Sequence, residues 1–279
     1  MSEQHPGKLI QGHPCGDYRL WPAYGSSDLA AMREGPPSRV QYRRSAEREA
    51  TDAMRVGTAC HMAVLEPARF AETYAFKPED MSFATKDGKA WRDAHADREI
   101  LTHLQAETVR GVAQAFAEKR EARDSLIGAL IEASLLWDDE SGISLKGRPD
   151  WIGKDWFIYD LKVSRFASAR SLPFRAWAEG WMHQAAHYRT GARAAGVIVK
   201  GCRLVVVHSQ PPHPVYLIEL KENDLDLLAL ENAETVRRLA ECDRTGKWPG
   251  TSDLWETIDL PASALTASLG ALDLGSEEA

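Results

Sequence analysis

The sequence lacks the features that would place the protein in a membrane, in a secretory pathway or among cysteine-ligated metalloproteins. No stretch of the 279 residues approaches the roughly 18 uninterrupted apolar residues that span a bilayer. The amino terminus lacks the basic-then-apolar order of a secretory signal, so we expect a cytoplasmic protein with no membrane partner. The four cysteines are scattered and form no CxxC pair, which argues against a zinc ribbon, an iron–sulfur cluster and a disulfide framework.

Positive charge is in the minority, and much of it is clustered. The net charge of −7 argues against a protein that coats nucleic acid non-specifically, but it allows a local basic channel inside an acidic exterior. Such a channel and an ordinary solvated face are both possible for the following clusters: Arg39, Arg43, Arg44 and Arg48; Lys146, Arg148 and Lys154; Arg165, Arg170 and Arg175.

The first half of the chain is mostly helical by pattern. Residues 1–24 are rich in Gly, Pro and polar side chains and predict an extended arm. Ser27 can cap a short helix that starts at Asp28. Residues 46–65 form a second helix candidate, and a long helical region is expected over residues 91–135.

The second half changes character and alternates strands with helices. Residues 142–152 and 156–163 predict strands joined by a short turn at Gly153-Lys154-Asp155. The remaining elements are a helix at 171–196, strands at 202–208 and 214–220, and an amphipathic helix at 222–246.

This order of elements predicts an α/β fold with a helical amino-terminal elaboration. We expect a single domain over residues 25–260, made of a helical part at 25–135 and an α/β core at 136–245. The last residues, 261–279, show little periodicity and are expected to form a flexible tail.

The predicted hairpin carries charge at the end of an apolar strand. Because side chains alternate along a strand, Asp160 and Lys162 share one face with Trp156. A turn centred on Lys154 would place Asp150 on the same side, diagonal to Asp160 and about 7–8 Å from it at the backbone. Two carboxylates at that distance can meet at one divalent cation.

A buried ion-pair network is the alternative to a metal site. Without a cation, two carboxylates on one apolar face repel each other, and one is driven to protonate. Lys162 can neutralise one of them and not both, although Arg148 on the same face could supply the second positive charge. The spacing alone leaves both interpretations open.

The same residues resemble the PD-(D/E)XK nuclease superfamily. Pro149-Asp150, followed by Asp160-Leu161-Lys162, is similar to its proline–aspartate and acid–any–lysine signature. Gln184-Ala-Ala-His-Tyr188 resembles the QxxxY element of the RecB-like and lambda-exonuclease-like branch, and its end residues share one helical face. The segments SSDLAAM…GPP, GTACHMAVLEPARF and GKWPG are similar to elements of RecE-type exonucleases (exodeoxyribonuclease VIII), and the similarity runs in the same order from about residue 18 to residue 260.

The resemblance implies roles for particular residues. Asp150, Asp160 and the carbonyl of Leu161 would bind Mg²⁺, for which Mn²⁺ can substitute, and His61 would complete the metal site. Lys162 would position or activate the attacking water. Gln184 and Tyr188 would hold the substrate strand or orient the catalytic groups. The positions expected to contact DNA are Arg148, Ser164 and Arg165.

The chain departs from the family pattern in two places. Val163-Ser164 stands where a threonine commonly follows the catalytic lysine, and the helical glutamate of the superfamily has Glu132 as its candidate. A histidine ligand is also unusual for magnesium, because imidazole suits softer metals. A buried structural histidine is therefore the alternative role for His61.

By the same resemblance the protein would be a metal-dependent exonuclease. It would digest linear double-stranded DNA from the 5′ end and leave a 3′ single strand for a recombinase or annealing protein, in a phage, a prophage or the host. Members of this family tend to form ring-shaped homo-oligomers. The alternatives are an endonuclease of the superfamily and a DNA-binding scaffold that has lost catalysis.

A zinc protease is a further alternative on the helix at 171–196. His183 and His187 have the spacing of the two zinc ligands of HExxH, but Gln184 stands where the general base belongs. The pattern therefore argues against a protease.

Overall fold

A computed structural model of the chain describes residues 7–46 and 49–252, together with residues 255, 257 and 259. Its strands are β1 (Lys8–Ile10), β2 (Tyr74–Phe76), β3 (Glu99–Leu101), β4 (Leu130–Ile131), β5 (Ser134–Asp138), β6 (Ser144–Gly147), β7 (Trp151–Ile152), β8 (Phe157–Ser164), β9 (Gly201–His208) and β10 (Val215–Glu219). Its helices are α1 (Cys15–Leu20), α2 (Ser26–Glu34), α3 (Pro37–Ser45), α4 (Asp52–Leu65), α5 (Pro67–Thr73), α6 (Lys86–Ala94), α7 (His103–Glu118), α8 (Arg120–Ser125), α9 (Leu172–Ala178), α10 (Trp181–Ala194) and α11 (Glu222–Thr245).

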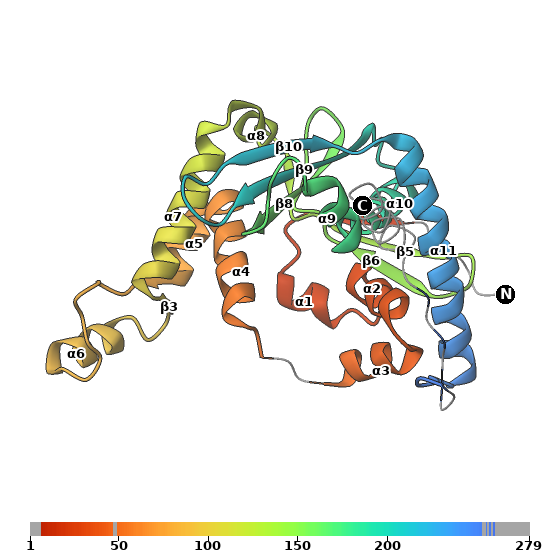
Figure 1. The fold of residues 1–279 in the computed structure, drawn as a ribbon, viewed down its shortest axis with the longest axis horizontal. Coiled ribbons are helices and arrows are strands. Elements are labelled where there is room, and N and C mark those ends of the chain that lie inside the picture. Colours follow the sequence, from red (N-terminus) through yellow and green to blue (C-terminus); the bar gives the residue numbers. More distant parts are fainter. Residues whose placement is uncertain (1–6, 47–48, 253–254, 256, 258, 260–279) are drawn as a thin grey trace, which may run out of the picture.

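The central sheet is built around β8, the strand that carries Asp160-Leu161-Lys162. The sheet has the strand order β10-β9-β8-β7-β4. Because β8 is parallel to β9 and antiparallel to β7, the sheet is mixed. A second, antiparallel sheet has the order β1-β5-β6. The protein therefore has the predicted α/β fold, and its central sheet is mixed and flanked by helices (Figure 1).

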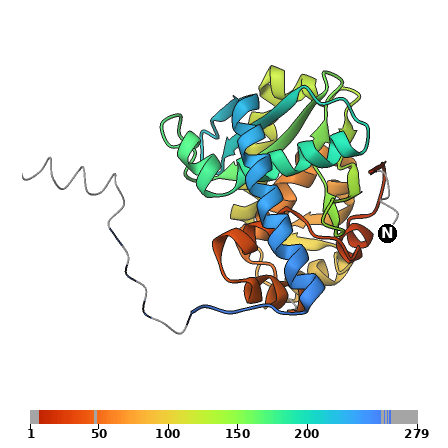
Figure 2. The same cartoon turned by 90° about the vertical axis from the view of Figure 1, so that its right-hand side faces the viewer.

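Apolar side chains of the central sheet form a core on each of its faces, because successive residues of β8 and β9 point to opposite sides. Tyr159, Leu161 and Val205 pack with α4 and α7 on one side. Ile158 and Leu204 pack with α2, α10 and α11 on the other. Figure 2 shows α11 running along that second side of the molecule.

Side-chain caps set where the two helices of the first face begin. The Thr51 hydroxyl accepts a hydrogen bond from the Met54 amide, so α4 starts at Asp52 rather than at residue 46. Thr102 and Gln105 form a capping box at the start of α7. The caps fix α4, the helix that carries His61, against α7.

Several sequence-based boundaries were wrong. The region 1–24 is not simply an extended arm, because β1 pairs with β5 and α1 is helical. The helical region expected over 91–135 contains β3, α7, α8 and β4 and ends in β5. The helix expected at 171–196 is two helices, because Gly180 takes a left-handed conformation with φ of 72° between α9 and α10.

The predicted strand at 142–152 is divided between two sheets. Its first part, β6, pairs with β5, whereas its last part, β7, pairs with β8 and β4. The hairpin that follows is longer than expected: the Gly153 amide donates to the Phe157 carbonyl, and Trp156 has φ of 66°. Trp156 is thus a turn residue, and the register differs from a turn centred on Lys154.

The flexible tail expected at 261–279 lies outside the described residues. Within the described part of the chain, no helix combines the length and the apolar character that crossing a bilayer requires.

Helix α10 packs on both sheets, and a glycine lets it approach the small sheet closely. This helix contacts β5 and β6 of the small sheet and β8 and β9 of the central sheet. Gly191 of α10 faces the buried indole of Trp137 on β5, and a Cβ at this position would lie 2.4 Å from a ring carbon. A side chain at position 191 would therefore push α10 away from the small sheet.

We predict that Gly191→Ala lowers the free energy of unfolding by about 1–3 kcal/mol, the usual cost of overpacking a core. The measurement is urea denaturation of the variant beside the parent protein. Gly16→Ala on α1 is the control, because a Cβ there meets nothing within 4 Å. Equal denaturation midpoints for Gly191→Ala and the parent would contradict the packing argument.

Candidate active site

The site forms where β7 begins beside the middle of β8. Trp151 of β7 pairs with Tyr159 of β8, and the same register continued by one residue sets Asp150 opposite Asp160. The two carboxylates are thus directly opposed and not diagonal, as the shorter predicted turn would have placed them. Both carboxylates have His61 and Lys162 among their charged neighbours, so they lie close together.

Asp150 is held from two sides. Its Oδ2 accepts a hydrogen bond of 2.6 Å from the Leu161 amide and lies 3.3 Å from Nδ1 of His61 on α4. Burial alone would raise the pKa of Asp150, but the charge and hydrogen bond of His61, the charge of Lys162 and the Leu161 amide outweigh it and lower that pKa. Asp150 is therefore stabilised as a carboxylate.

The pKa of Asp160 is shifted in the opposite direction, upward. Burial raises its pKa, and the negative charge of Asp150 adds to this effect. The Lys162 ammonium, 2.5 Å from Asp160 Oδ2, opposes the rise without cancelling it. Keeping Asp160 charged therefore costs free energy in the folded protein.

Lys162 connects the strand to α10. Its Nζ donates a hydrogen bond of 2.7 Å to Oε1 of Gln184, whose Nε2 donates one of 2.8 Å to the hydroxyl of Tyr188. Burial raises the pKa of Tyr188 well above its usual value, so the phenol stays neutral. The two ends of the QxxxY element thus lie in one chain of hydrogen bonds with the lysine of β8.

Each carboxylate has a basic partner from the protein, so the ion-pair alternative balances better than the sequence suggested. The second partner is His61 and not Arg148. Burial lowers the pKa of His61, but the charge and hydrogen bond of Asp150, with a further contribution from Asp160, raise it overall. The expectation that Arg148 could supply the missing charge was wrong, because its guanidinium is directed elsewhere.

The donors at this site nevertheless fit a hard divalent cation. Asp160 Oδ2 is buried without a hydrogen bond of ordinary geometry. Carboxylate and carbonyl oxygens, from Asp150, Asp160 and Leu161, are the ligands that Mg²⁺ and Mn²⁺ prefer. In the described part of the chain, however, no three His, Cys, Asp or Glu side chains are arranged to hold a metal ion. Binding would require His61 or Lys162 to draw back from its carboxylate.

Arg148 and Glu132 form a structural pair beside the site. Arg148 donates to Glu132 Oε2 at 2.8 Å, to the hydroxyl of Ser134 and to the carbonyl of His13, and its side chain is 12% exposed. A direct contact of Arg148 with DNA is therefore not supported. Glu132 lies between β4 and β5 with φ of 45° and not on a helix, so it is not the helical glutamate of the superfamily.

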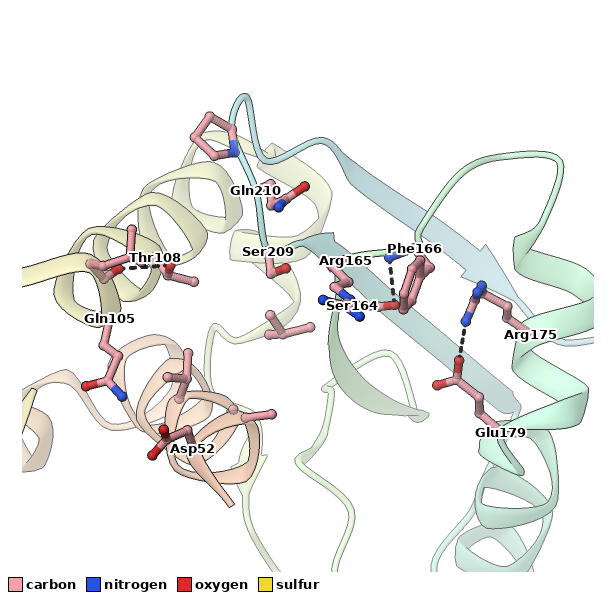
Figure 3. Close-up of a pocket in the computed structure, with 16 residues that line it drawn as sticks. Asp52, Gln105, Thr108, Ser164, Arg165, Phe166, Arg175, Glu179, Ser209 and Gln210 are labelled. Atoms are coloured by element: carbon pink, nitrogen blue, oxygen red, sulfur yellow. Dashed lines mark hydrogen bonds and ion pairs between the residues drawn. The ribbon is translucent and has the colours of Figure 1, made fainter. Parts of the chain in front are cut away.

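Ser164 and Arg165, the other two residues expected to contact DNA, lie at the end of β8 in a cleft of about 790 Å³. The cleft is walled by α4, α7, α9, the loop after β8 and the loop between β9 and β10 (Figure 3). We call it the β8 cleft. Ser164 Oγ accepts a hydrogen bond from the Phe166 amide, which fixes the start of the loop.

The two histidines at zinc-protease spacing do not form a metal site. His183 Nε2 lies 2.9 Å from a carboxylate oxygen of Glu231, and His187 Nε2 lies 2.9 Å from the carbonyl of Lys146. Burial lowers the pKa of His187 to about 4. Both rings are therefore structural, in agreement with the absence of the HExxH glutamate.

Comparisons with known proteins bear on the fold and the family of the chain. A family model described as a PDDEXK-like domain of unknown function (DUF3799) matches residues 26–261. The crystal structure of a "Putative exonuclease" from Eubacterium rectale aligns with a TM-score of 0.60 and 13% identity, over 89% of this chain and 93% of that one. At this identity the likeness shows the fold alone. A second structure, SSO0001, reaches a TM-score of 0.29 with 15% identity over 80% of this chain and 86% of that one, which carries no argument. The search of curated proteins found no significant match.

The fold and the family match place the protein in the PD-(D/E)XK nuclease superfamily. Within it, the chain belongs to the PDDEXK-like family DUF3799, whose model covers it from residue 26 to residue 261.

Sequence reasoning missed most of the β8 cleft. Gly57, Phe166, Arg175 and Gln210 line it but come from four separate segments. The parallel pairing of β8 with β9 places the loops after these two strands side by side, and α4 and α9 add the other two segments. Such contacts between distant segments leave no local sequence pattern. The available signal was the mixture of arginine and phenylalanine that follows Lys162.

We predict opposite effects of the two aspartates on the stability of the protein in EDTA. Asp150→Asn should lower the free energy of unfolding at pH 7 by about 1–3 kcal/mol, since it removes a hydrogen-bonded charge. Because the folded pKa of Asp150 is lowered, its contribution is present above the unfolded value of about 3.9 and is lost as the pH falls through the folded pKa.

Asp160→Asn should instead raise the free energy of unfolding. The folded pKa of Asp160 is raised, so the cost of its charge appears as the pH rises above the ordinary carboxyl value. Urea denaturation at a series of pH values that extends from pH 7 to below the ordinary carboxyl pKa of about 3.9 measures both variants. Equal destabilisation by the two substitutions at pH 7 would show that the two carboxylates do not differ in this way.

Proposed function

We propose that the protein is a metal-dependent deoxyribonuclease. The observation that supports this proposal is that residues from α4, β8 and α10 and the residue before β7 meet at one place, in the combination that the superfamily signature implies. They are His61, Asp150, Asp160, Lys162, Gln184 and Tyr188. Asp150, Asp160 and the Leu161 carbonyl would hold Mg²⁺, or Mn²⁺ in its place, with His61 beside them.

Each residue has a part in phosphodiester hydrolysis. When bound, a divalent ion lowers the pKa of water and offsets charge on the phosphate. Lys162 holds an ammonium at the carboxylates, where it can orient the attacking water and stabilise negative charge on the phosphate. Gln184 fixes that ammonium through a hydrogen bond of 2.7 Å, and Tyr188 in turn orients Gln184. Gln184 and Tyr188 therefore act through the lysine as positioning residues.

The finer proposal is a RecE-like exonuclease that acts on the ends of linear double-stranded DNA. It would degrade the 5′-ended strand and leave a 3′ overhang for a recombinase or annealing protein, and it would work as a ring-shaped homo-oligomer. The resemblance of the segments around His61 and Asp28 to RecE-type exonucleases supports this proposal. The description of the Eubacterium rectale neighbour as a "Putative exonuclease" is compatible with it.

A binding or scaffold protein on the same fold is the second candidate. It is favoured by the ion pairs of Asp150 with His61 and of Asp160 with Lys162, which satisfy the carboxylates within the protein. The presence of every charged residue of the signature argues for the enzyme instead.

We predict that the purified protein cleaves linear duplex DNA when Mg²⁺ is added and that EDTA abolishes cleavage. Asp160→Ala should reduce the rate roughly a hundredfold or more, the scale of losing one preorganised charge-stabilising group. Asp93→Ala is the matched control, because Asp93 lies on α6, which projects from the body of the molecule (Figure 1).

A time course on 5′-labelled duplex, 3′-labelled duplex and a closed circle separates the finer alternatives. Early release of the 5′ label with an intact circle supports the proposed polarity. Degradation of the circle at a comparable rate would make the protein an endonuclease, and intact DNA with retained binding would favour the scaffold.

We also predict that DNA binding weakens with salt, with a log–log slope of about −0.9 for each phosphate neutralised. Arg165→Ala should reduce the magnitude of this slope by about 1, as expected for loss of one phosphate contact. The measurement is fluorescence anisotropy in EDTA with a linear duplex that has a single-stranded overhang. Arg237→Ala is the control, since this exposed arginine of α11 is paired with Glu234. An unchanged slope in Arg165→Ala would remove Arg165 from the DNA-binding surface.

A further inference from the structure

The β8 cleft is continuous with the catalytic residues along two elements. Val163 and Ser164, which line it, follow Lys162 on β8. On α4, Ala53 and Gly57 line the cleft, and His61 lies one further turn along the same helical face. A polymer that occupies the cleft would therefore contact the two elements that carry His61 and Lys162.

Close packing does not explain why position 57 is a glycine. It lies in the interior of α4, where glycine costs roughly 0.5–1 kcal/mol relative to alanine. A Cβ at this position would meet nothing within 4 Å, in contrast to Gly191 and its close contact with Trp137. A glycine that faces open space in a cleft lets another backbone approach the helix closely.

The opposite wall carries an exposed aromatic ring flanked by arginines. Phe166 is 51% exposed, and the guanidinium carbons of Arg165 and Arg175 lie 4.6 Å and 4.4 Å from its ring centroid. Arg175 is held by Glu179 at 2.7 Å, whereas the ion pairs of the described residues include no carboxylate partner for Arg165 (Figure 3). Nucleic-acid bases stack on aromatic rings and on guanidinium planes of this kind.

The size and chemistry of the cleft fit a single strand better than a duplex. A volume of about 790 Å³ is on the scale of a ligand of a few nucleotides. Stacking on Phe166 requires an unpaired base, because a duplex covers the faces of its bases. Hydroxyl and amide groups of Thr108, Ser209 and Gln210 line the same space and can bond to the sugar–phosphate backbone.

We propose that the β8 cleft binds an unpaired DNA strand on its way to the catalytic residues, with a base stacked on Phe166 and the sugar–phosphate backbone passing over Gly57. This inference rests on the proposed deoxyribonuclease function and adds to it the form of the DNA that reaches the site. Position 57 should then show opposed effects: Gly57→Ala improves helix propensity and raises the melting temperature, yet it weakens strand binding.

The test is binding of a fluorescently labelled oligothymidylate, measured by anisotropy in EDTA so that no hydrolysis occurs. Phe166→Ala and Gly57→Ala should each weaken binding, the former roughly tenfold, the scale of one base–aromatic stack. Both should leave the affinity for a blunt hairpin duplex within about twofold, a difference of only ~0.4 kcal/mol. Phe166→Leu, which keeps an apolar side chain without an aromatic face, should repeat the effect of Phe166→Ala and guards against misfolding of the smaller variant.

Matched controls exist for both positions. Tyr42→Ala removes a 67% exposed aromatic ring from α3, outside the cleft, and Gly16→Ala adds a methyl group to a helical glycine that also faces open space. Neither should change binding of the oligonucleotide. Wild-type protein that fails to bind it, cleft variants that bind like the wild type, or a loss in Tyr42→Ala equal to that in Phe166→Ala would each overturn the inference.

Failure of this inference can be told apart from failure of the proposed function. A protein that cleaves duplex DNA with Mg²⁺ while its cleft variants bind oligothymidylate normally retains the nuclease function without this cleft role. A protein that cleaves nothing, but loses oligothymidylate binding in Phe166→Ala, supports the cleft as a strand-binding site and removes the nuclease.

Discussion

The burial of two opposed carboxylates is the constraint on which the rest of the site depends. Asp150 and Asp160 face each other across β7 and β8, where water is largely excluded and isolated charges are costly. The fold offsets this cost with two basic side chains. His61 comes from α4 and lies against Asp150, and Lys162 comes from β8 itself and lies against Asp160. Because Lys162 is fixed in turn by Gln184 on α10, the charges tie together the helices on both faces of the central sheet.

The same constraint makes the two aspartates unequal. Asp150 receives the Leu161 amide as well as His61, so its charge is stabilised, whereas Asp160 has Lys162 alone against deep burial and a neighbouring negative charge. A carboxylate that is poorly compensated by the protein has the most to gain from a cation. Under the proposed metal-dependent function, the unfavourable charge of Asp160 is the physical reason for an ion to bind beside it rather than beside a fully satisfied acid.

Part of the geometry of the candidate site could be predicted from the sequence because it depends on local spacing. Asp160 and Lys162 share a face by alternation along one strand, and Gln184 and Tyr188 by helical spacing. The register of Asp150 was wrong because Trp156 takes a left-handed conformation that lengthens the turn. His61 was found by resemblance alone, and the pairing of Arg148 with Glu132 was missed, because contacts between distant segments leave no local pattern.

Ion pairing also determines how much positive charge the arginine clusters of this acidic chain present at the surface. In the clusters that the sequence singled out, Arg39, Arg44, Arg148 and Arg175 each have a carboxylate partner in the structure. Such pairs contribute little net charge to their surroundings, so a count of arginines along the sequence overstates what a phosphate would meet. Arg165 differs, since the ion pairs of the described residues include none for it and its guanidinium lies over the Phe166 ring. It follows Lys162 by three residues on the same segment, so under the proposed function it is the arginine of these clusters best suited to meet a phosphate.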